Sequence, residues 1–284
     1  MRRSTTSAVT KRPLLGLLLL VELVVAVVLV ARPFDGLGLP TDQTGPPAAA
    51  HASLGVPTSP TNPLTLRDGR TVSLMALGGT QTADLAGRIV AELDGAADAV
   101  TAFWGDDWPR TIAVVLTGTD EEFRALGVSG SDIAAATTAQ RIVFAPGATS
   151  MSDASLRIVL RHELFHYAAR SRTAADAPRW LTEGVADFVG RPPTAMPSPE
   201  RAAELAHLPT DADLDTPGEV RSLAYDRAWW FSRFVASRYG AQALRQLYVD
   251  ACGAGHPDVA TAIRETLDAD TTQVLASWRD WLSG

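Results

Sequence analysis

The most constraining feature of this chain is the pentapeptide His162-Glu163-Leu164-Phe165-His166, which lies in an apolar stretch of helix-forming residues. Residues four positions apart lie one above the other on a helix, so His162 and His166 can reach one metal ion. Glu163 lies about 100° further round, where it can reach a water on that metal without competing as a ligand. Burying two histidines and a glutamate is costly unless they are paired or bind a metal. The pentapeptide therefore predicts a zinc site, because zinc accepts neutral imidazole.

A catalytic zinc usually has three protein ligands, so one ligand has to come from elsewhere in the chain. Pro178 suits the first turn of a second helix, with Asp176 or Ala177 at its cap. Glu183 and Asp187 are four residues apart and share a face of that helix. We assign Glu183 as the third zinc ligand.

Asp187 is expected to stand behind the metal ligands. Its carboxylate would accept the spare ring N–H of a ligating histidine and fix the tautomer of that ring. The alternative for Asp187 is an ordinary ion pair with an arginine such as Arg179 or Arg191.

These motifs resemble the gluzincin branch of the zincin metallopeptidases, the thermolysin-like or peptidase MA-like group. In that group an H-E-x-x-H helix is followed by a helix with a glutamate ligand, often with an acidic residue four positions further on. The matching residues are His162, Glu163, His166, Glu183 and Asp187. A metzincin would instead need glycine and histidine where Ala169 and Arg172 stand.

The resemblance implies a zinc-dependent hydrolase, a metalloprotease that cleaves peptide bonds of a protein or peptide substrate. Glu163 would be the general base on a zinc-bound water and would return the proton to the leaving amine. Gluzincins supply the oxyanion donor from a Tyr or His outside the zinc motif, and Tyr225 is our candidate. Its context, with Ala228 and Phe231, fits a loose pattern of related chains. A tyrosine packed in the core explains Tyr225 nearly as well, and His207 is the weaker alternative donor.

The segment 140–145 is expected to form a strand with a second role. In the resembling family the edge strand of the sheet borders the cleft, and an extended peptide pairs with it by strand addition. The resemblance thus makes four residues candidates for substrate binding: Arg141, Ile142, Val143 and Phe144. The alternative is a plain core strand.

The whole pattern predicts an α+β fold: a small mixed β-sheet with zincin active-site helices and a helical C-terminal part. Asp68-Gly69 between two β-prone runs predicts a hairpin. The other expected elements are a helix over 82–104, a strand over 111–116, a short helix capped by Thr119, the metal helix over 153–170, and C-terminal helices over 222–239, 241–252, 256–268 and 271–282.

An apolar run from Leu14 to Ala31 precedes this domain. As a helix it would be about 27 Å long, nearly the hydrocarbon thickness of a bilayer. Basic residues before it favour a transmembrane signal anchor over a cleaved signal peptide. We therefore expect a cytoplasmic basic segment 1–13, the transmembrane helix 14–31, a flexible linker 32–62, and a metallopeptidase domain 63–284. This places a single-pass protein in the cell membrane with its catalytic domain extracytoplasmic.

The composition of the chain limits the kinds of binding partner and the covalent cross-links to be expected. The chain has 284 residues and a net charge of −7, which argues against nucleic acid as a partner. Its single cysteine, Cys252, excludes an intrachain disulfide. Two alternatives stay open: a catalytically inactive, membrane-anchored binding module with a zincin fold, and an interaction protein whose H-E-x-x-H is coincidental.

Overall fold

The computed structural model describes residues 63–128 and 133–284. The expected basic segment, transmembrane helix and linker, all within 1–62, lie outside the described residues. Within the described ranges, none of the helices has both the length and the apolar character needed to cross a membrane.

The N-terminal half is built on a mixed five-stranded sheet with the order β1-β2-β3-β5-β4. The hairpin of β1 (Leu64–Thr65) and β2 (Thr71–Ala76) is antiparallel, and its turn places Gly69 at φ 83°. β2 pairs in parallel with β3 (Thr111–Leu116), and β3 pairs in parallel with β5 (Ile142–Phe144). β4 (Ala135–Thr137) closes the sheet, antiparallel to β5. The expected hairpin and the strand over 111–116 are confirmed.

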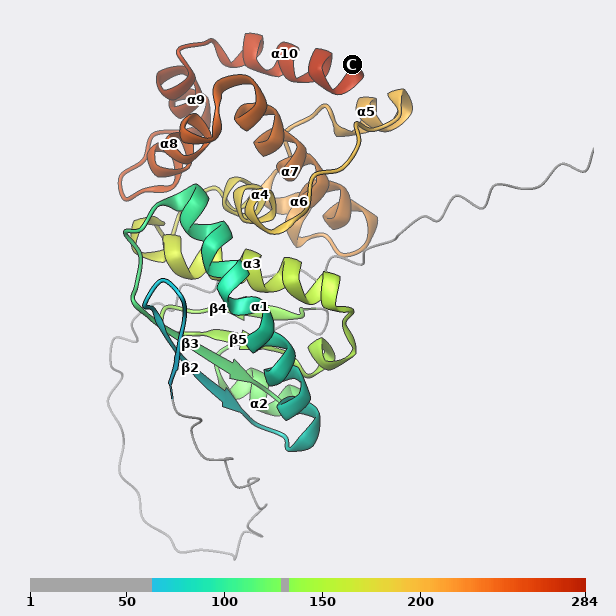
Figure 1. Ribbon diagram of the computed structural model, residues 1–284. Coiled ribbons are helices and arrows are strands. Elements are labelled where there is room, and N and C mark those ends of the chain that lie inside the picture. The colour runs from blue at the N-terminus through green and yellow to red at the C-terminus, as the bar shows by residue number, and fades with distance from the viewer. Residues whose placement is uncertain (1–62, 129–132) are drawn as a thin grey trace, which may run out of the picture.

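Helices lie on both faces of this sheet (Figure 1), and they bury β4 and β5 on both sides, whereas β2 leaves Ser73 and Met75 exposed. One face packs against α1 (Thr80–Trp104) and α3 (Asp153–Ala169) in the main hydrophobic core. The other face meets α2 (Asp120–Ala125) in a smaller apolar cluster that contains Phe123 and Val143. Thr119 and Glu122 form a capping box at the start of α2, as sequence predicted for the cap. Two 3₁₀ turns, η1 (Pro146–Ser150) and η2 (Arg170–Arg172), flank α3.

The second half is helical and lies on the far side of α3 from the sheet (Figure 1). It consists of α4 (Arg179–Gly190), α5 (Pro199–Leu205), α6 (Asp211–Asp215), α7 (Glu219–Tyr239), α8 (Ala241–Cys252), α9 (Val259–Leu267) and α10 (Thr271–Ser283). The four C-terminal helices begin and end within three residues of the expected bounds. The α+β fold class therefore fits the described part of the chain.

The expectation that 140–145 provides the edge strand is wrong. β5 lies inside the sheet, between β3 and β4, so its backbone is paired on both sides. The side chains of Ile142, Val143 and Phe144 are fully buried, and the backbone of Arg141 is engaged with Thr138 in the turn before β5. These four residues therefore form core and turn, and the sheet edge next to α3 is β4. The three-residue β4 was missed because it is too short to show a periodic pattern.

The cap of α4 also differs from expectation. Pro178 itself occupies the N-cap position and provides no side-chain cap. The carboxylate of Asp211, from α6, accepts hydrogen bonds from the backbone N–H groups of Arg179 (3.1 Å) and Trp180 (2.9 Å). Two of the unpaired N–H groups at the helix start are thereby satisfied from a distant segment.

A glycine sets the spacing between α4 and α7. A Cβ added to Gly184 would lie 2.6 Å from the backbone oxygen of Ala228, closer than real side chains approach. Only glycine allows the two helices to come this near. The close approach brings Glu183 on α4 beside Tyr225 on α7.

Candidate metal centre

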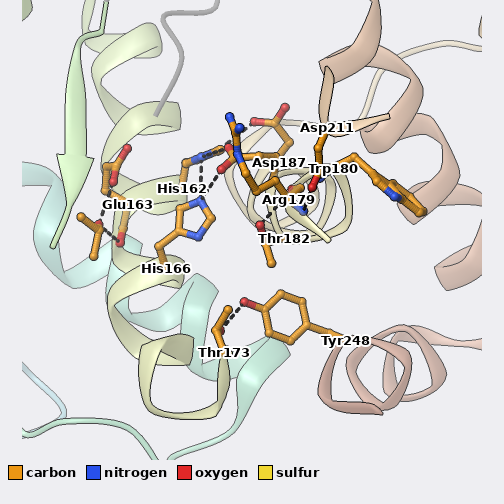
Figure 2. A network of polar contacts seen from close by, with 12 residues as sticks. His162, Glu163, His166, Thr173, Arg179, Trp180, Thr182, Asp187, Asp211 and Tyr248 are labelled. Carbon is orange, nitrogen blue, oxygen red and sulfur yellow. Dashed lines mark hydrogen bonds and ion pairs between the residues drawn. The ribbon is translucent and has the colours of Figure 1, made fainter. Parts of the chain in front are cut away.

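The first part of the site is carried by α3. The side chain of Ser152 caps this helix by accepting the N–H of Ser155, and Asp153 adds a negative charge to the first turn. The third and later turns are almost wholly buried, so His162 and His166 are held within the core, 5% and 4% exposed. Both rings point away from the sheet toward α4 (Figure 2).

Three ligand atoms meet between α3 and α4. Nε2 of His162 lies 3.1 Å from Nε2 of His166 and 3.2 Å from Oε2 of Glu183. Nε2 of His166 lies 3.6 Å from Oε1 of Glu183. The ligand atoms of the three residues all lie within 4.8 Å of one another, the one such cluster in the described part of the chain.

The geometry of this triangle fits zinc. Ligand atoms placed tetrahedrally at zinc–nitrogen bond length are about 3.3 Å apart. The observed separations of 3.1–3.6 Å bracket that value without any movement of the helices. Two imidazoles and one carboxylate form a ligand set of catalytic zinc sites, and it leaves a fourth position open.

Asp187 stands directly behind His162, one turn of α4 after Glu183. The Nδ1–H of His162 donates a hydrogen bond of 2.9 Å to Oδ1 of Asp187. This contact leaves Nε2 as the nitrogen that faces Glu183 and His166. Asp187 thus has the position expected of a residue that fixes the tautomer of a metal ligand.

Asp187 also has the ion pair that was considered as its alternative role. Its Oδ2 lies 2.7 Å from Nη2 of Arg191, and Nη1 of Arg191 lies 3.0 Å from Asp226. Asp226 contacts Arg201 at 2.7 Å, nearer the surface. A chain of alternating charges therefore runs from His162 outward through α4, α7 and α5.

The pKa values of His162 and Glu183 are set by a balance between burial and their charged neighbours. Burial opposes a charge on His162, but hydrogen bonds and charge attraction from Asp187 and Glu183 outweigh it and raise its pKa to about 10. Burial would raise the pKa of Glu183, yet the charge of His166 and hydrogen bonds from both histidines lower it to about 2. Without metal, His162 therefore carries an extra proton at neutral pH, next to an ionised Glu183. A zinc ion would take the place of this proton, since ligating imidazole must be neutral.

Glu163 points toward the sheet side of α3, where its carboxylate meets β4, whereas the histidine rings point toward α4 (Figure 2). It is fully buried, and the hydroxyl of Thr137 on β4 lies 2.7 Å from its Oε2. Burial raises the pKa of Glu163, against the opposing effects of His162, His166 and the Thr137 hydrogen bond. A raised pKa suits a group that must accept and return a proton near neutral pH.

Tyr225 comes from α7 and is 1% exposed. Burial and the carboxylates of Glu183 and Asp187 raise the pKa of Tyr225 well above its ordinary value. Its hydroxyl therefore stays protonated and can donate a hydrogen bond beside Glu183. His207, the weaker alternative donor, is exposed just after α5.

Sequence reasoning missed two contributors to this site. Thr137 lies on the short β4 strand, and Asp211, the first residue of α6, caps the start of α4. Neither has a fixed sequence distance from the zinc motif, so only the tertiary fold brings them to it. Arg191 was considered, but as an alternative to the His162–Asp187 contact, whereas Asp187 makes both contacts at once.

No protein-family model and no curated protein matches the sequence. Among solved structures, the chain is similar to an M1 zinc metallopeptidase from Deinococcus radiodurans, with 21% identity and a TM-score of 0.48 over 77% of this chain and 50% of that one. A mutant of that enzyme bound to a Tyr-Ser-Ala substrate gives 20% identity and a TM-score of 0.45, over 79% and 51%. The chain thus spans about half the length of the solved structures it matches. At this level of similarity, function has to be argued from the site itself.

Proposed function

We propose that this protein is a zinc-dependent peptidase. The observation that carries the proposal is the buried triangle of His162, His166 and Glu183, with a buried glutamate next to the first histidine on the same helix. A purely structural zinc site is usually closed by four Cys or His ligands, and it has no use for Glu163. An open zinc position, together with a carboxylate of raised pKa on the residue next to a zinc ligand, would suit hydrolysis.

In the proposed mechanism, His162, His166 and Glu183 hold the metal, and Asp187 keeps Nδ1 of His162 protonated. When bound, zinc would polarise the scissile carbonyl and lower the pKa of a bound water toward about 7. Glu163 accepts the proton of the attacking water and passes it to the nitrogen of the leaving amine. The Tyr225 hydroxyl donates a hydrogen bond to the negative charge that develops on the carbonyl oxygen.

We also propose that the domain is tethered outside the cytoplasm by the apolar run from Leu14 to Ala31. The basic residues before that run support this orientation. The test is protease digestion of sealed inside-out and right-side-out membrane vesicles. Cleavage of residues 63–284 only in right-side-out vesicles agrees with the proposal, and cleavage only in inside-out vesicles contradicts it.

The peptidase proposal is tested on the purified full-length chain by zinc analysis and by hydrolysis of labelled casein. We expect about one zinc per chain and measurable hydrolysis in the wild type. Glu163→Gln should keep the zinc and lose turnover by ~10²-fold or more, because the general base is gone. Glu121→Gln changes an exposed helix carboxylate in the same way and is the matched control.

Either of two results would overturn the proposal. Wild-type protein without zinc, even after incubation with zinc salt, would remove the metal site. Full zinc content with equal casein hydrolysis in the wild type and Glu163→Gln would remove Glu163 as the base. Zinc without any hydrolysis in the wild type would favour the inactive binding module.

A further inference from the structure

The hydroxyl of Thr137 lies between two oxygens of one residue, Glu163. Its Oγ1 is 2.7 Å from Oε2 of the Glu163 carboxylate and 2.9 Å from the backbone oxygen of Glu163. Thr137 is 1% exposed and Glu163 is 0% exposed, so no bulk water competes for this contact. The contact joins the edge strand β4 to the middle of α3.

A hydroxyl has one proton to donate, so it can fully satisfy only one of these two oxygens. The backbone oxygen of Glu163 lies in the interior of α3, where it accepts the helical N–H of Tyr167. The carboxylate oxygen has no such helical partner. Hydrogen bonds to ionised acceptors are also roughly twice as strong as neutral ones. The Thr137 proton therefore belongs on Oε2 whenever Glu163 is ionised.

The second carboxylate oxygen of Glu163, Oε1, differs from Oε2 in its hydrogen bonding. Oε1 is buried and has no hydrogen-bond partner in the described part of the chain. Buried polar atoms without a partner are uncommon and call for an explanation. The protein thus holds one oxygen of the carboxylate and leaves the other without a partner among the described residues.

We propose that Thr137 is a positioning residue for the general base: its hydroxyl holds Oε2 of Glu163, so that Oε1 is the oxygen that exchanges the proton. The inference rests on the proposed peptidase function. Without the hydroxyl, the carboxylate loses its one fixed contact and can rotate about its terminal bond. Substrate and zinc binding depend on other groups and should be unaffected.

Thr137 could instead serve only to attach β4 to α3. Thr117 provides the comparison, because its buried hydroxyl donates to the backbone oxygen of Phe144 at 2.8 Å and so joins neighbouring strands. Thr117→Val and Thr137→Val remove the same group from the same sheet. Only the second removes a contact to Glu163.

The first experiment measures zinc content, kcat and KM on labelled casein for the full-length wild type, Thr137→Val, Thr137→Ser and Thr117→Val. We expect Thr137→Val to keep its zinc and its KM but to lose kcat by ~10–100-fold, as small misplacements of catalytic groups do. Thr137→Ser should restore most of kcat, and Thr117→Val should resemble the wild type. Equal kcat in Thr137→Val and Thr117→Val would overturn the inference, as would a serine variant no better than the valine variant.

The second experiment does not depend on turnover. It compares thermal midpoints of Thr137→Val, Glu163→Gln and the double variant, with Thr117→Val plus Glu163→Gln as the control pair. Contacting residues couple, so the double variant should shift the midpoint by less than the sum of the single shifts. The control pair should be additive. A wild type without hydrolysis would overturn the peptidase proposal alone, whereas additive shifts for Thr137 and Glu163 would overturn this inference alone.

Discussion

The two sides of α3 differ in how they hold their functional groups. On the side that faces α4, His162 is fixed by Asp187, which is itself fixed by Arg191 and, through it, Asp226. On the side that faces the sheet, the carboxylate of Glu163 is held, among the described residues, by the hydroxyl of Thr137.

The difference matches the chemistry proposed for each side. A metal ligand should not move, and charged pairs in a buried site impose strict geometry, since breaking one leaves an uncompensated charge. A general base has to change its charge in every turnover. The hydroxyl of Thr137 is neutral, so it orients the carboxylate without adding a charge of its own, and burial still raises the pKa of Glu163 against the effects of His162 and His166. The groups on the α4 side of α3 are thus held by ion pairs, and the carboxylate on the sheet side is held by a neutral hydrogen bond.

Glu183→Ala should have the largest effect on zinc binding, because it removes a metal ligand from the α4 side of α3. Zinc affinity should fall by more than the ~10–100-fold typical of losing a partner behind a ligand. Zinc per chain after dialysis against a weak chelator measures the effect. Glu121→Ala, which removes an exposed carboxylate from α2, is the control. Unchanged zinc content in Glu183→Ala would show that the third ligand is another residue.

Sequence alone was enough to bring together the residues of the α4 side that lie closest to the expected metal. His162 and His166 on one helix, and Glu183 and Asp187 on another, lie at fixed helical spacings, and helical spacing can be read from the chain. The roles of these residues stay predictions until metal and activity are measured.

The sheet side was not predictable in the same way. Thr137 reaches Glu163 only through the pairing of β4 with β5, in a strand of three residues with no periodic signal. The error about 140–145 has the same origin: a short apolar strand shows that it is buried but not whether it lies at an edge. Order within a sheet depends on crossovers between distant segments.

Tyr225→Phe tests whether Tyr225 takes part in the reaction or only orients the zinc ligand Glu183. If the hydroxyl stabilises the oxyanion, kcat should fall by ~10²–10³-fold with KM nearly unchanged and zinc retained. If it only orients Glu183, zinc affinity should fall instead, and kcat at saturating zinc should recover. Steady-state kinetics at two zinc concentrations separates the two roles. Tyr239→Phe, which changes a tyrosine at the end of α7, is the matched control.

Of the three substitutions at the site, Asp187→Asn should have the smallest effect. Together with Asp226→Asn, it tests whether the charged residues beyond Asp187 contribute to zinc affinity. The amide can still occupy the site but no longer balances Arg191 or favours the Nδ1–H tautomer of His162, so zinc affinity should fall by ~10–100-fold. Asp226→Asn removes the next carboxylate outward, which is one-third exposed and better screened by water. Its effect should stay within about threefold, since partly exposed ion pairs contribute about 0–1 kcal/mol. Zinc titration of both variants against a competing chelator gives the ratio. Equal losses would mean that the whole chain of charges acts as one unit, and that the rigidity of the metal side extends to the surface.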